Sequence, residues 1–119
     1  MAAAIYQYPK CSTCRKALKW LDAHDVKYEA TDLVANALPA RKLADLHARS
    51  GLPIAKFFNT AGESYRAGNF KEKLPSMSLA QSLDALAADG KLVKRPILDL
   101  GRTVLVGFDE AAYKAAQRG

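Results

Sequence analysis

Two cysteines, Cys11 and Cys14, lie three residues apart where a strand-like run gives way to a helix-like run. They are the only cysteines in the chain. A cysteine at the start of a helix receives free backbone N–H groups and the positive end of the helix dipole, and both favour the thiolate over the thiol. The pattern therefore predicts an acidified nucleophile at Cys11 and a resolving thiol, one helical turn further on, at Cys14.

A structural disulfide and a structural zinc site are two other interpretations of the cysteine pair. A structural disulfide would close a four-residue loop and stabilise the protein by only about 2 kcal/mol. A structural zinc site needs four ligands. The two histidines, His24 and His47, lie in separate helix-like segments without a second ligand cluster. A redox pair is the favoured interpretation, ahead of a metal site or incidental thiols, and it implies no organic or metal cofactor.

Length and composition limit the class of protein. We expect one domain over residues 1–119, and half of the residues are apolar, which is enough for a hydrophobic core. The sequence contains no run of 18 apolar residues, so we expect no membrane-spanning segment. The first residues lack the features of a secretory signal, and the close cysteine pair suits a reducing compartment, so we expect a cytoplasmic protein.

The formal net charge of +6 predicts an anionic partner. An oxyanion, glutathione, a nucleic acid and an acidic protein surface all meet that description. Direct nucleic-acid binding rests on the charge alone, because the sequence has no recognition-helix signature and no pattern of stacking aromatic residues. We therefore expect no direct contact with nucleic acid.

Strand-like and helix-like segments follow one another in a definite order. We expect strands at residues 3–7, 26–31, 97–100 and 103–106, and helices at residues 15–23, 39–50, 54–58, 79–88 and 109–117. Residues 65–73 have no assignable pattern. The order is β-α-β, a helical block over about residues 36–92, then β-β-α. The connections predict a four-stranded mixed sheet, with the first two strands parallel and the last two antiparallel, in an α/β (α+β) fold.

A cysteine pair at the first strand–helix junction of such a pattern is typical of a thioredoxin-like fold. Arg95 and Pro96, directly before the third strand, strengthen this interpretation. In that fold a cis-proline faces the cysteine site, although trans is much the commoner isomer for a proline in general. We expect Pro96 to be cis and to lie beside Cys11.

Four segments resemble the arsenate reductase (ArsC)/Spx family of thioredoxin-like proteins, in the family's order and with its spacing. They are residues 8–17 (YPKCSTCRKA), 56–60 (KFFNT), 95–97 (RPI) and 106–108 (VGF). The resemblance implies a thioredoxin-like fold whose helical block is inserted between the second and third strands. In the glutaredoxin-coupled arsenate reductases, one nucleophilic cysteine matches Cys11, and one of the arginines that hold the oxyanion matches Arg95. Asn59 and Gly107 occupy roughly the places of two others.

The resemblance implies two functions. The first is an arsenate reductase-like enzyme, in which thioredoxin, or glutathione with glutaredoxin, restores the dithiol. The second is an Spx-like redox switch, in which Cys14 matches the second cysteine, the pair senses oxidation, and the protein docks on the RNA polymerase α-subunit. The Spx proteins dock through a glycine in the turn after the second helix, and Gly51 lies in a similar turn.

An oxyanion or disulfide substrate at Cys11 would meet several polar groups. The backbone N–H groups of Thr13 and Cys14 face an anion at the helix start. Ser12 and Thr13 supply hydroxyl groups. Arg95 supplies a planar guanidinium, and Arg15 is a second candidate. We expect the site to comprise these residues with Pro96.

Overall fold

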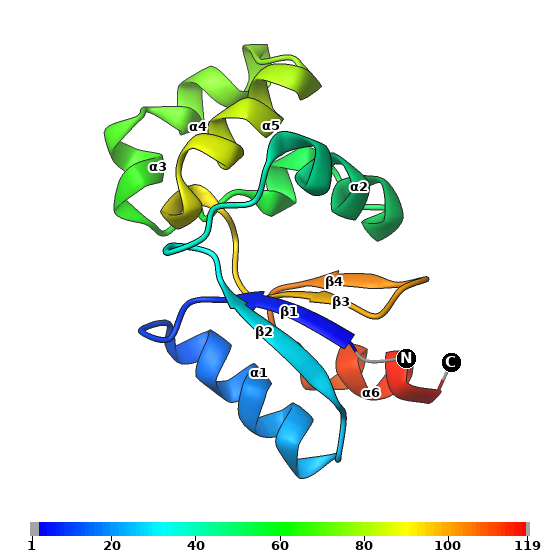
Figure 1. The fold of residues 1–119 in the computed structure, drawn as a ribbon. Helices are drawn as coiled ribbons and strands as arrows, with labels where there is room; N and C mark the ends of the chain where they lie inside the picture. The colour runs from blue at the N-terminus through cyan, green and yellow to red at the C-terminus, as the bar shows by residue number, and fades with distance from the viewer. Residues whose placement is uncertain (1–2, 119) are drawn as a thin grey trace.

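The computed structural model describes residues 3–118, which form a four-stranded mixed sheet in the order β2-β1-β3-β4 (Figure 1). The strands are β1 (Ala3–Gln7), β2 (Tyr28–Asp32), β3 (Ile97–Asp99) and β4 (Val104–Val106). β1 is parallel to β2 and antiparallel to β3, and β3 is antiparallel to β4. The predicted α/β class and the predicted strand directions are confirmed.

The register of the sheet brings two distant segments to one edge. Tyr6, near the end of β1, pairs with Ile97, the first residue of β3. Because the two strands are antiparallel, the chain leaving β1 and the chain entering β3 meet at that edge. The cysteine loop follows β1, and Arg95 and Pro96 precede β3. The sheet therefore places these two segments side by side.

Helices cover both faces of the sheet (Figure 1). α1 (Ser12–Ala23) and α6 (Glu110–Arg118) lie on one face, where Ile5, Leu21, Leu98 and Tyr113 form a buried core. The helical block lies on the other face and comprises α2 (Ala40–Ser50), η1 (Ile54–Phe57), α3 (Glu63–Ala67), α4 (Phe70–Lys73), η2 (Leu74–Ser76), α5 (Leu79–Ala88) and η3 (Gly90–Leu92). A second core, built from apolar residues of β1, β3, α2 and α5, joins this block to the sheet.

Strand boundaries differ from the prediction by one or two residues. The second strand begins at Tyr28 because the turn after α1 is longer than expected: Asp25 has a φ of 55°, and the Val26 N–H donates to the Leu21 carbonyl. The hairpin strands are each one residue shorter than expected, and the Leu100 N–H donates to the Thr103 carbonyl across the turn between them.

The helical block contains the segment that sequence patterns did not assign. Residues 63–73 form the two very short helices α3 and α4, separated by Asn69 in the left-handed region at a φ of 55°. Tyr65 and Phe70 stack at 6.1 Å between ring centroids, and Phe70 also contacts the buried Phe58. These aromatic contacts attach the short helices to the core.

Over residues 3–118, none of the helices combines the length and the apolar character needed to cross a bilayer.

Candidate active site

Cys11 is the N-cap residue of α1. Its backbone is extended, with φ −89° and ψ 120°, and its Sγ accepts a hydrogen bond from the Cys14 N–H at 3.4 Å. Its own N–H donates to the Tyr8 carbonyl at 2.9 Å, which closes the loop between β1 and α1. The side chain is half-buried. Cys11 therefore takes the place that a serine or aspartate cap usually holds, with sulfur as the acceptor.

The surroundings of Cys11 favour its thiolate. Partial burial raises the pKa of Cys11, but the hydrogen bonds from Cys14 and the positive charge of Arg95 outweigh burial, so the net shift is downward. A hydrogen bond or a positive charge stabilises the ionised form of a thiol. The surroundings of Cys11 thus favour the predicted acidification, and the positive charge that lowers its pKa comes from Arg95.

Cys14 has the opposite environment. Its side chain is fully buried, and its Sγ accepts a hydrogen bond from the Tyr8 N–H at 3.5 Å. Burial raises the pKa of Cys14 to about 12, with the nearby Cys11 thiol acting in the same direction. Both cysteines are unbridged. The pair therefore consists of one half-buried thiol with a lowered pKa and one buried thiol with a raised pKa.

Arg95 is held over the ring of Tyr8, with 5.2 Å between its guanidinium carbon and the ring centroid. Its Nη1 lies 3.3 to 3.5 Å from the carbonyl oxygens of Gly90, Lys91 and Val93. Its Nε is buried and has no acceptor among residues 3–118. The peptide bond between Arg95 and Pro96 is cis, as predicted. The contacts of Nη1 and of the Tyr8 ring hold the guanidinium in place, and the Nε–H remains able to donate a hydrogen bond.

The remaining predicted residues occupy the start of α1. Ser12 is the first residue of the helix and is exposed, and Thr13 is half-buried. The Thr13 hydroxyl makes no hydrogen bond within the described part of the chain. Arg15 is exposed and donates from Nη1 to the Pro9 carbonyl at 3.3 Å. Arg95, rather than Arg15, is the arginine whose charge acts on Cys11.

Asn59 and Gly107 lie on the loops that flank Arg95. The Asn59 N–H donates to the Leu92 carbonyl at 2.7 Å, and its Nδ2 lies 3.4 Å from the Lys91 carbonyl. Gly107 has a φ of 81°, and its N–H donates to the Pro96 carbonyl at 2.7 Å. Both residues brace the turn that carries Arg95. Neither position supplies the arginine that the glutaredoxin-coupled reductases are expected to carry there.

Neither the role of Tyr8 nor the groove next to its ring was predicted from the sequence. Tyr8 contacts the site twice, through its N–H on Cys14 and its ring on Arg95. A groove of about 330 Å³ adjoins it and is lined by Tyr8, Asn59, Gly62, Glu63, Ser64, Lys91 and Arg95. Tyr8 belongs to the segment that carries the family resemblance, and that position was the available signal for its role.

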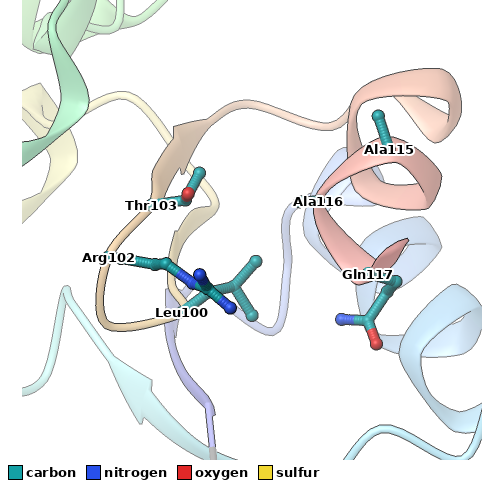
Figure 2. Close-up of a pocket in the computed structure, with 6 residues that line it drawn as sticks. All are labelled: Leu100, Arg102, Thr103, Ala115, Ala116 and Gln117. Atoms are coloured by element: carbon teal, nitrogen blue, oxygen red, sulfur yellow. The ribbon is translucent and has the colours of Figure 1, made fainter. Parts of the chain in front are cut away.

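A hollow of similar size lies near the β3–β4 turn, outside this site. Figure 2 shows it between that turn and α6, lined by Leu100, Arg102, Thr103, Ala115, Ala116 and Gln117. It contains no thiol or carboxylate. Within residues 3–118, no group of three or more histidine, cysteine, aspartate or glutamate side chains converges as a metal site would require.

Comparison with known proteins gives consistent results. The ArsC family model matches residues 6–116. The uncharacterized protein YusI of Bacillus subtilis is 44% identical over 114 residues, covering 96% of this chain and 97% of that protein. The crystal structure of a possible arsenate reductase from Streptococcus mutans has a TM-score of 0.87 and 40% identity, covering 96% of this chain and 97% of that one.

A regulator is also among the relatives. The global transcriptional regulator Spx of Lactiplantibacillus plantarum is 26% identical over 106 residues, covering 89% of this chain and 79% of that protein. The family model nevertheless spans nearly the whole chain, including the cysteine loop and the Arg95–Pro96 turn. This chain belongs to the ArsC family and has its thioredoxin-like fold.

Proposed function

We propose that this protein is an arsenate reductase-like thiol–disulfide redox protein, with Cys11 as the nucleophile and Cys14 as the resolving cysteine. The observation that carries the proposal is the contrast between the two thiols. The half-buried Cys11 has a lowered pKa, whereas the buried Cys14, one turn along the same helix, has its pKa raised to about 12. A nucleophilic cysteine needs an accessible thiol with a lowered pKa, as at Cys11. A resolving cysteine that reacts only in the second step can be buried with a raised pKa, as at Cys14.

The first step is attack by the Cys11 thiolate on one sulfur of a disulfide. A bond forms between Cys11 Sγ and that sulfur, and the other sulfur leaves as a thiolate. Cys11 then carries no negative charge. Because the Cys11 thiolate was one of the groups that disfavoured ionisation of Cys14, the pKa of Cys14 falls at this point. The attack on the substrate thus makes the Cys14 thiol easier to ionise.

The second step joins the two cysteines. Cys14 gives its proton to the departing thiolate or to water, and the Tyr8 N–H and the charge of Arg95 favour the resulting thiolate. Cys14 Sγ attacks Cys11 Sγ, the second half of the substrate leaves as a thiolate, and a Cys11–Cys14 disulfide remains. Thioredoxin, or glutathione with glutaredoxin, then supplies the two electrons that regenerate the dithiol.

The arrangement of positive charge bears on the substrate. Arsenate is a multiply charged oxyanion, and a tight site for it needs several fixed donors. Arg95 is the arginine that acts on Cys11, and Asn59 and Gly107 serve as braces. We therefore infer that a disulfide or another oxidised thiol is a better substrate than arsenate. We also infer, from the close cysteine pair, that the protein acts in the cytoplasm.

A coupled assay tests the proposed function. Disulfide and arsenate are each supplied with thioredoxin and its reductase, and separately with glutathione and glutaredoxin. We expect turnover with disulfide that is lost in Cys11→Ser, and little turnover with arsenate. Faster turnover with arsenate would identify the protein as an arsenate reductase, and no turnover with any pair would refute the enzymatic function.

A second candidate is a redox-sensing regulator that binds the RNA polymerase α-subunit. The named Spx relative favours it, as does Gly51, which is exposed with open space around it after α2. Gly51 also has a φ of 71°, so its conformation is explained by the end of the helix. Binding of the purified α-subunit to the dithiol and disulfide forms distinguishes the regulator from the enzyme.

A further inference from the structure

The groove described above shares two residues with the surroundings of Cys11, although Cys11 does not itself line it. Tyr8 and Arg95 line one end of it, and both also belong to the surroundings of Cys11. The Cys11 N–H bonds the Tyr8 carbonyl, and the charge of Arg95 lowers the pKa of Cys11. Tyr8 and Arg95 therefore connect Cys11 to this groove.

The wall of the groove is held by a set of short-range contacts. The Asn59 carbonyl accepts a hydrogen bond from the Gly62 N–H at 3.1 Å. A Cβ atom on Gly62 would lie 2.6 Å from Asn59 Nδ2, so glycine permits this close approach. Asn59 Nδ2 and Arg95 Nη1 lie 3.4 and 3.3 Å from the same Lys91 carbonyl oxygen. The two loops that form the groove are thereby fastened together.

The groove presents charges of both signs. Glu63, the first residue of α3, and Lys91, in η3, are both exposed, and neither side chain makes an ion pair or hydrogen bond within residues 3–118. Arg95 adds a buried Nε without an acceptor in the same part of the chain. The groove thus offers a carboxylate for a cation and two basic groups for an anion.

We propose that this groove selects small disulfides whose thiol bears both an ammonium and a carboxylate group, the amino-acid thiols. Glu63 pairs with the ammonium group, and Lys91 and Arg95 pair with the carboxylate. A volume of about 330 Å³ is at the lower end of the range for small-molecule sites, which suits an amino acid or a short peptide. The inference rests on the proposed attack by Cys11.

The selective step is a balanced exchange. The Cys11 thiolate and a symmetrical disulfide R–S–S–R give a mixed disulfide between Cys11 and R–S, and R–S⁻ leaves. No further oxidant or reductant enters this step. The retained R–S group is the part that occupies the groove, so its charges determine how fast the adduct forms.

Four symmetrical disulfides separate the contributions of charge. Cystamine carries ammonium groups, 3,3′-dithiodipropionate carries carboxylates, cystine carries both, and 2-hydroxyethyl disulfide carries neither. Each is mixed with the Cys14→Ser variant, in which the adduct persists, and adduct formation is followed by mass spectrometry. For each compound, the rate of adduct formation is compared between variants, so differences in intrinsic reactivity among the four disulfides cancel.

The charge pairs predict which reactions slow down. Glu63→Gln should slow the reactions of cystamine and cystine, measured against 2-hydroxyethyl disulfide in the same variant. Lys91→Gln should slow those of 3,3′-dithiodipropionate and cystine. Each effect should be about two- to fivefold, the size expected for a partly exposed ion pair, and should shrink in concentrated salt.

Matched controls exclude a general effect of net charge. Glu29→Gln and Lys27→Gln make the same charge changes at exposed positions outside the groove, in and next to β2. They should not change the relative rates. Equal effects of groove and control variants, or no charge dependence, would overturn the selection while leaving the proposed exchange intact. Failure of all four disulfides to react would instead overturn the proposed function.

Discussion

At the scale of single residues, two identical side chains acquire opposite properties from their surroundings. Cys11 caps a helix and lies near Arg95, whereas Cys14 is enclosed by the core. The hydrogen bond from the Cys14 N–H and the charge of Arg95 stabilise the Cys11 thiolate more than partial burial disfavours it. Chemistry at this site therefore depends on which thiol ionises first.

The first prediction concerns the order of ionisation. In Cys14→Ser, the pKa of Cys11 should lie below the free-cysteine value of about 8.5. In Cys11→Ser, the pKa of Cys14 should lie well above that value, because burial disfavours its thiolate. The rate of alkylation by iodoacetamide as a function of pH gives both values. Faster alkylation of Cys14 than of Cys11 at neutral pH would reverse the assignment of roles.

The second prediction concerns Arg95. Arg95→Gln should raise the pKa of Cys11, because a positive charge near the thiolate is lost. Arg95→Lys should raise it less, because the charge remains while the planar donor disappears. The same alkylation profile measures the change, and circular dichroism verifies that each variant folds. An unchanged profile in folded Arg95→Gln would leave Arg95 with a purely structural role.

At the scale of elements, the sequence was most informative where local rules decide the structure. The strand–helix junction at Cys11 followed from a short pattern, whereas the cis isomer of Pro96 was expected from the thioredoxin-like fold and not from a local rule. The capping box of α5, with Ser78 and Gln81, also agrees with its sequence. The start of β2 was predicted two residues too early, because the hydrophobic pattern does not show the geometry of the turn after α1.

The groove was less predictable than the cysteine site. It joins residues 59–64 to residue 91 and to Tyr8, and no local pattern reports contacts over such separations. α3 and α4 span five and four residues, too few to show helical periodicity. The proposed roles of Glu63 and Lys91 therefore depend on the folded structure, which brings α3 and η3 to the same groove.

One polar cluster holds α2 against the sheet and gives the third prediction. Arg49 donates to both Asp99 carboxylate oxygens, at 2.7 and 3.0 Å, and to the Gly101 carbonyl at 2.6 Å. Asp99→Asn should lower the free energy of unfolding by about 1.5–3 kcal/mol, the range for a hydrogen bond to a charged group. Urea denaturation measures this loss. Asp84→Asn, at an exposed position on α5, is the matched control and should have little effect.

The same cluster should depend on pH. The hydrogen bond from Arg49 holds the pKa of Asp99 below its usual value. Because the pKa is depressed in the folded state, its contribution to stability is present above the unfolded-state value of about 3.9 and is lost as the pH falls through the folded value. The difference between wild type and Asp99→Asn should therefore narrow in acid. A constant difference from pH 7 to pH 2 would contradict this role.

At the scale of the whole molecule, the sheet brings together two segments of the site that lie far apart in the sequence. The cysteine loop follows β1, and the Arg95–Pro96 turn connects the helical block to β3, which pairs with β1 (Figure 1). The block supplies the far wall of the groove, while α1 positions both thiols. Nucleophile, charge and groove therefore meet at one edge of the sheet.

We propose that Cys14 resolves adducts on Cys11 within the molecule. Residues i and i+3 are neighbours on a helix, and well-oriented groups of this kind can react as if at about 10⁵ M or more. An external thiol at cellular concentration should therefore be slower than Cys14. Arg95 and the Tyr8 N–H favour the Cys14 thiolate once Cys11 has become neutral.

The most direct test is mass spectrometry of the wild-type protein after oxidation by diamide in the presence of glutathione. We predict a Cys11–Cys14 disulfide, lighter than the dithiol by two hydrogen atoms and reducible by thioredoxin, whereas Cys14→Ser should accumulate glutathione on Cys11. A stable glutathione adduct on Cys11 of the wild type, with Cys14 still a free thiol, would contradict the account.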